Sequence, residues 1–154
     1  MKKLFCFLII SFFLNFAPAQ KVEVQTLLKD DISIRALQIY DGKVWYSGTH
    51  SKFGYVSLKD SADKKQMKLS DKKLEFRTLA QDSKNFYTIN ILSPANFFKI
   101  DKKSLKSEIV FKDTAKTAFY DALHFGKDGF GFALSDPNGK EAAISSLRIG
   151  GKFW

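Results

Sequence analysis

The feature that most constrains this chain is an internal repeat with a period of about 42 residues. Residues 34–58 align with residues 76–100 at a shift of 42, and apolar character and spacing agree along the whole stretch. The alignment matches Arg35 with Arg77, and a third copy, at a shift of about 44, matches Arg77 with Asp121. A repeat of roughly 40–50 residues with four short strands is typical of one β-propeller blade. The sequence therefore predicts an all-β chain that forms a partial β-propeller of about three four-stranded blades.

Each repeat unit shows the same succession of strand and turn signals. An alternating segment such as residues 34–39 indicates a strand with one buried face. Asp41-Gly42, Asp82-Ser83 and residues 127–129 favour hairpin turns, and aromatic-rich strands follow them. The further predicted strands lie at residues 44–46, 54–58, 66–69, 85–89, 96–100, 107–111 and 130–134. No segment shows a clean helical stripe, and the 42-residue period argues against a β-sandwich or an up-and-down barrel.

The N-terminal segment has the pattern of a cleavable secretory signal peptide. Two lysines precede an apolar run over residues 4–16, and Ala17-Pro18-Ala19 supplies small residues at a cleavage site. The run is short for a membrane span, although an uncleaved anchor is the alternative. We expect residues 1–19 to be removed, which leaves residues 20–154 as the repeat domain. The mature chain is then exported, periplasmic or extracellular, with no membrane span.

The charge of the chain is carried almost entirely by lysine. The formal net charge is +9, and Arg35 and Arg77 are two of only three arginines. Specific nucleic-acid binders usually gather arginine and exposed aromatics on one face, so we expect no nucleic-acid partner. The lysine pairs Lys64-Lys65, Lys72-Lys73 and Lys102-Lys103 are interpreted as solvated loops or as edge strands protected by lysine. Cys6, the one cysteine, lies in the signal, so no disulfide or thiol chemistry is expected afterwards.

Three segments carry a resemblance to a known family. They are Phe76-Arg77-x-Leu79, Phe119-Tyr120-Asp121-Ala122-Leu123-x-Phe125 and Gly131-x-Ala133-x-Ser135-Asp136-Pro137-x-x-Gly139. These residues resemble the exported propellers related to the photosystem II assembly and stability factor, within the sialidase-type Asp-box (BNR) repeat superfamily. The resemblance implies a ring of about six or seven blades. It also implies a role in binding or assembly rather than catalysis.

The C-terminal segment departs from that family pattern. Residues 149–154 resemble the Gly-x-x-Trp close of an Asp box, but Leu147 and Ile149 stand at its Ser and Asp positions. The sequence also ends during its third or fourth unit. We therefore expect a truncated copy of a longer propeller, with open blade faces that favour self-association.

The candidate binding residues follow from the repeat. On a propeller, Arg35 and Arg77 would occupy matching points of adjacent inner strands near the central channel. Asp121 would take the same place in the third unit, with Tyr120 beside it. Three interpretations stay open: a structural ion-paired set, a patch that binds a protein or an acidic ligand, and a remnant of sialidase chemistry. That chemistry needs an arginine cluster, a Tyr with a Glu partner and an Asp acid, which the sequence does not assure.

Two further features bear on chemistry. Ser135 and Asp136 lie in a turn-rich loop that is either a structural turn or part of a ligand site. His50 and His124 share no motif spacing, so we expect no metal site, and no motif for a cofactor is present. The leading functional prediction is an exported, non-catalytic protein with a protein-binding or assembly role. The alternatives are a degenerate sialidase-like glycoside hydrolase and a truncated gene remnant without activity.

Overall fold

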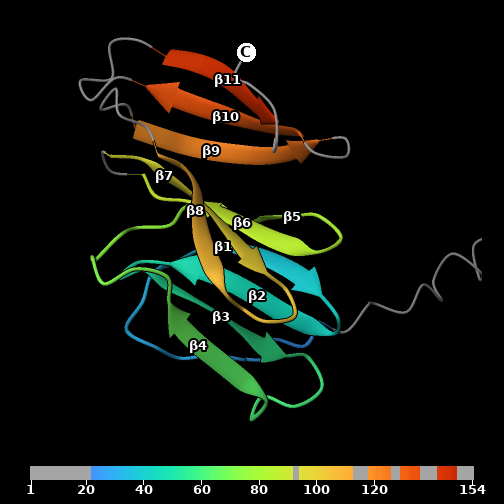
Figure 1. The fold of residues 1–154 in the computed structure, drawn as a ribbon. Coiled ribbons are helices and arrows are strands. Elements are labelled where there is room, and N and C mark those ends of the chain that lie inside the picture. The colour runs from blue at the N-terminus through green and yellow to red at the C-terminus, as the bar shows by residue number, and fades with distance from the viewer. Residues whose placement is uncertain (1–21, 92–93, 113–117, 126–128, 136–141, 149–154) are drawn as a thin grey trace, which may run out of the picture.

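The computed structural model describes residues 22–91, 94–112, 118–125, 129–135 and 142–148, with side chains described as far as residue 112. These residues form antiparallel strands in three sheets and contain no helix (Figure 1). The strands are β1 (Ile34–Tyr40), β2 (Lys43–Gly48), β3 (Lys52–Ser57), β4 (Lys64–Lys68), β5 (Ala80–Gln81), β6 (Asn85–Ile89), β7 (Asn96–Asp101), β8 (Ser107–Lys112), β9 (Ala118–Phe125), β10 (Gly129–Ser135) and β11 (Ala142–Arg148). The expected all-β fold class is confirmed.

In each sheet, strands that follow one another along the chain lie side by side. The first sheet has the order β1-β2-β3-β4, the second sheet β5-β6-β7-β8, and the third sheet β9-β10-β11 among the described residues. Asp41 and Gly42 both have positive φ, 51° and 67°, as the predicted two-residue hairpin turn requires. At the next turn, the Asp82 carboxylate accepts the backbone N–H groups of Lys84 and Asn85 at 2.7 and 2.6 Å. Both predicted turns are confirmed.

The repeat is visible in the strand pairing of the first and second sheets. Because strand register fixes which residues share a face, equivalent registers mean equivalent faces. A shift of 42 carries the pair Ile34–Gly48 onto Phe76–Asn90, and the pair Gln38–Trp45 onto Ala80–Tyr87.

The alignment of the third strands differs from the expectation. Val44 pairs with Val56 in the first sheet, and Phe86 pairs with Ile100 in the second, so the third strands are related by a shift of 44. The alignment of Leu58 with Ile100 at a shift of 42 is therefore wrong. The reason is a longer connection between β6 and β7 than between β2 and β3.

The second sheet lies between the other two and is buried on both faces (Figure 1). On one face, Phe86, Phe98 and Ile100 pack with Trp45 and Phe53 of the first sheet. The ring centroids of Trp45 and Phe86 are 4.6 Å apart. Alternate residues form a second cluster on the opposite face, and β9 contacts β5 and β6. That cluster consists of Ala80, Tyr87, Ile89, Ala95 and Phe97.

Polar groups also join the first and second sheets. The Ser47 hydroxyl donates to the carbonyl oxygen of Thr78 at 3.1 Å, and the Thr88 hydroxyl donates to the same oxygen at 2.6 Å. The Gln38 side chain donates to the carbonyl oxygen of Leu79 at 2.9 Å. These bonds satisfy buried backbone carbonyls, and those from Ser47 and Gln38 tie the segment of the second sheet that carries Arg77 to the first sheet.

Candidate functional site

Arg35, the first predicted binding residue, lies at a β-bulge in β1. Ile34 pairs with Gly48 and Ala36 pairs with Ser47, so Arg35 is the extra residue on its strand. A bulge redirects the side chain of the extra residue and often adjoins a functional site. The Arg35 side chain is exposed.

Arg77 occupies the same position in the second sheet. Phe76 pairs with Asn90, and Ala80 pairs with Tyr87, so this strand also carries one residue more than its partner between the two pairs. Arg77 follows Phe76 as Arg35 follows Ile34, and it too is exposed. The equivalent register of the two arginines is therefore confirmed.

The third sheet corrects the expected place of Asp121. Asp121 pairs with Ala133 and Phe119 pairs with Leu134, so the extra residue of the β9 bulge is Tyr120. Tyr120, rather than Asp121, is thus the equivalent of the two arginines. The reason is the register of the strands: Phe86 pairs with Gln81, whereas Phe130, its repeat equivalent at a shift of 44, pairs with His124 at a shift of only 43 from Gln81.

The remaining predicted site residues are not brought to this position. Ser135 is the last residue of β10, while Asp136 lies outside the described residues. Within the described ranges, no three His, Cys, Asp or Glu residues gather as a metal site would require. No helix in the described part of the chain is long and apolar enough to cross a membrane.

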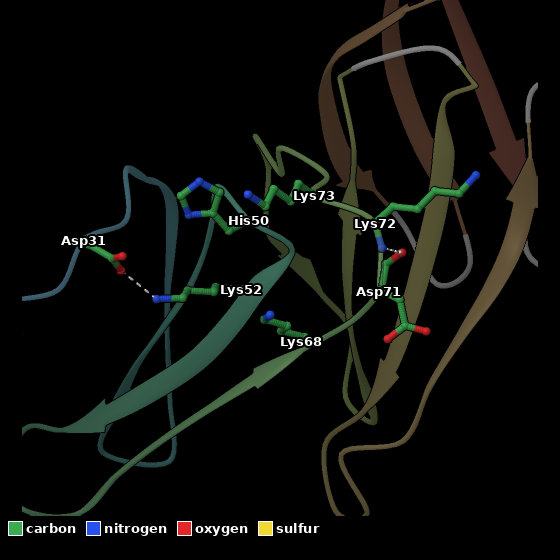
Figure 2. Close-up of a pocket in the computed structure, with 8 residues that line it drawn as sticks. Asp31, His50, Lys52, Lys68, Asp71, Lys72 and Lys73 are labelled. Carbon is green, nitrogen blue, oxygen red and sulfur yellow. Dashed lines mark hydrogen bonds and ion pairs between the residues drawn. The ribbon is translucent and has the colours of Figure 1, made fainter.

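The structure shows a second candidate site, a hollow of about 260 Å³ at one end of the first sheet (Figure 2). It lies between the β2–β3 turn, the end of β4 and the connection that follows β4. The lining is strongly charged, with four lysines, one histidine and two aspartates. The lining residues are Asp31, His50, Lys52, Lys68, Ser70, Asp71, Lys72 and Lys73.

Hydrogen bonds of Ser51 hold together two segments of this hollow that are far apart in the sequence. His50 and Ser51 both have positive φ, 60° and 58°, which turns the chain sharply before β3. The fully buried Ser51 hydroxyl donates to the carbonyl oxygen of Lys72 and accepts the backbone N–H of Leu74 at 2.9 Å. The backbone N–H of Ser51 donates to the carbonyl oxygen of Leu74 at 2.8 Å. The connection after β4 is therefore fixed against the turn that carries His50.

The N-terminal segment neutralises one of the lysines. The Lys52 ammonium lies 2.9 Å from the carboxylate of Asp31 and 3.2 Å from that of Asp30. The hydrogen bond to Asp31 is the main cause that raises the pKa of Lys52. A hydrogen bond from Gln66, followed by one from the Asp31 backbone, holds the pKa of Asp30 well below its usual range. Lys52 therefore lines the hollow with a charge that is already paired with Asp30 and Asp31.

The other lysines leave the hollow cationic. Figure 2 shows Lys73 extending toward His50, with Lys68 on the side of Lys52, while the side chains of Asp71 and Lys72 extend away. The lysines of the first two pairs are exposed, as the sequence predicted, but Lys102 of the third pair is half-buried and donates to Gln81 and to the carbonyl oxygen of Asp82. The sequence interpretation also missed that Lys68 and Lys73 meet at this hollow. The feature that could have located this hollow is the turn at His50 and Ser51, where two residues other than glycine have positive φ.

No family model matches the chain, and no curated protein matches it. The resemblance to exported propellers therefore rests on the three segments quoted above.

Proposed function

We propose that this chain is an exported, non-catalytic protein of the propeller type, with a role in binding or assembling another protein. The stacking of consecutive meander sheets supports the propeller assignment. The second sheet packs one face against the first sheet and its opposite face toward the third. A further sheet of the same type can therefore pack against the end of the stack in the same way.

Two uncovered apolar side chains on β1 of the first sheet carry this proposal. Leu37 is the repeat equivalent of Leu79 at a shift of 42. Leu79 is 6% exposed because it packs into the core shared with the first sheet, whereas Leu37 is 59% exposed. Ile39, two residues further along the same strand face, is 67% exposed. We call Leu37 and Ile39 the open face. In the second sheet, the corresponding face receives a neighbouring sheet.

The partner that this geometry fits is a further sheet of the same repeat type. The first sheet covers the second with Trp45, Phe53 and Tyr55, and a sheet with a similar aromatic face would cover the open face in the same way. Each of the two exposed side chains contributes about 1–2 kcal/mol when it is buried. A second copy of this chain supplies such sheets, so self-association is the direct test.

The experiment is sedimentation velocity over a concentration series of the exported chain. We expect the wild type to self-associate and the double variant Leu37→Lys, Ile39→Lys to remain monomeric with an unchanged circular dichroism spectrum. Ile109→Lys is the matched control, because Ile109 is also an exposed apolar residue, at 52%, but lies on β8 of the second sheet. A wild type that is monomeric at all concentrations contradicts the proposal.

A further inference from the structure

The outer strand of the first sheet offers an edge for pairing. β4 has β3 on one side, and no strand of the described residues pairs with its other edge. Its sequence is Lys64-Lys65-Gln66-Met67-Lys68, and all of these side chains except that of Met67 are exposed. Lysine on an edge strand discourages pairing with a similar edge. Opposite charges facing each other across two strands stabilise the pair, so the same lysines favour an acidic strand.

The edge strand leads directly into the cationic hollow. Lys68 is the last residue of β4 and lines the hollow together with Lys73 and His50. The hollow, about 260 Å³, is smaller than the roughly 300–1,000 Å³ of sites for drug-sized ligands. It has room for one or two acidic side chains of a chain that runs along β4.

We propose that β4 and this hollow form a docking site for an extended, acidic peptide segment of a partner protein. The segment adds to the free edge of β4 through main-chain hydrogen bonds, and its carboxylates reach Lys68 and Lys73. The hollow contains no arginine, so it lacks the bidentate donor that favours planar phosphate or sulfate recognition. The site is separate from the open face and does not depend on the self-association proposed above.

The test uses the full-length chain and short fluorescent peptides in an anisotropy titration. One peptide alternates Glu with Thr, the second has Gln in place of every Glu, and the third keeps Glu but has Pro in place of every Thr. We expect the Glu–Thr peptide to bind, and its affinity to fall as salt rises. The Gln peptide should bind at least tenfold more weakly because it lacks charge. The Pro peptide should also bind at least tenfold more weakly, because proline at every second position removes half of the backbone N–H donors and fixes φ at about −65°, away from the extended strand.

Charge-reversal variants locate the site. Lys68→Glu with Lys73→Glu should weaken binding of the Glu–Thr peptide at least tenfold. Lys103→Glu with Lys106→Glu makes the same change in net charge at exposed positions in the connection between β7 and β8 and should alter binding less than twofold. Equal losses in both double variants, or equal binding of the Pro peptide, would overturn the proposal. Binding of a sulfated polysaccharide without binding of the Glu–Thr peptide would also overturn it.

Discussion

Thr78→Val and Thr88→Val make the same chemical change at two buried positions and should have opposite effects. Thr78 is 5% exposed and Thr88 is 0% exposed. The Thr88 hydroxyl donates to the Thr78 carbonyl oxygen at 2.6 Å, whereas the Thr78 hydroxyl has no hydrogen-bond partner among the described residues. Loss of a satisfied hydrogen bond costs about 1 kcal/mol, and removal of a buried unsatisfied hydroxyl gains about 1–3 kcal/mol. Valine keeps the branched shape in both cases.

The assay is equilibrium unfolding in urea, followed by tryptophan fluorescence. Thr88→Val should lower the free energy of unfolding by about 1 kcal/mol, and Thr78→Val should raise it by at least about 1 kcal/mol. The two variants should therefore differ by about 2 kcal/mol or more. Equal destabilisation by both variants would refute the reasoning, because it would mean that the Thr78 hydroxyl is paired or that the two sheets meet differently.

Three further predictions follow from the sequence and the structure. Mass spectrometry of exported material should find Gln20 at the N-terminus, and recovery of mature protein that starts at Met1 would contradict the signal peptide. Burial opposes ionisation of Asp82, but hydrogen bonds from Tyr87 and from the backbone of Lys84 and Asn85 outweigh it and lower the pKa of Asp82. Its stabilisation is complete above the unfolded pKa of about 3.9 and is lost as pH falls through the folded pKa. The stability gap between wild type and Asp82→Asn, measured by thermal unfolding, should therefore shrink below about pH 4, and a constant gap would contradict it. Because Arg35 is exposed, Arg35→Glu should change the free energy of unfolding by less than about 0.5 kcal/mol. A larger loss, measured by urea unfolding, would make Arg35 structural.

Local signals in the sequence were sufficient to predict the fold class and the first two strands of each unit. Asp41-Gly42 predicted a hairpin turn, and both residues have positive φ. The shared position of Arg35 and Arg77 was also predictable, because pairing in the first two strands keeps the shift of 42.

Features that depend on strand register or on single polar contacts were not predictable. The place of Tyr120 at the bulge position depends on the register between β9 and β10, which apolar spacing does not reveal. The cationic hollow depends on the hydrogen bonds of Ser51 to Lys72 and Leu74, across a separation of more than 20 residues. Such a contact joins two polar segments, and neither hydrophobic periodicity nor turn composition indicates it.

Site-specific thiol labelling tests the open face most directly. Without residues 1–19 the chain has no cysteine, since Cys6 is the only one, so Leu37→Cys introduces a single reactive thiol. We predict that the labelling rate at residue 37 falls as protein concentration rises, because an incoming sheet covers the open face. The rate in a matched Ile109→Cys variant should stay constant. Labelling rates that are independent of concentration at both positions would contradict the proposal that the first sheet receives a partner.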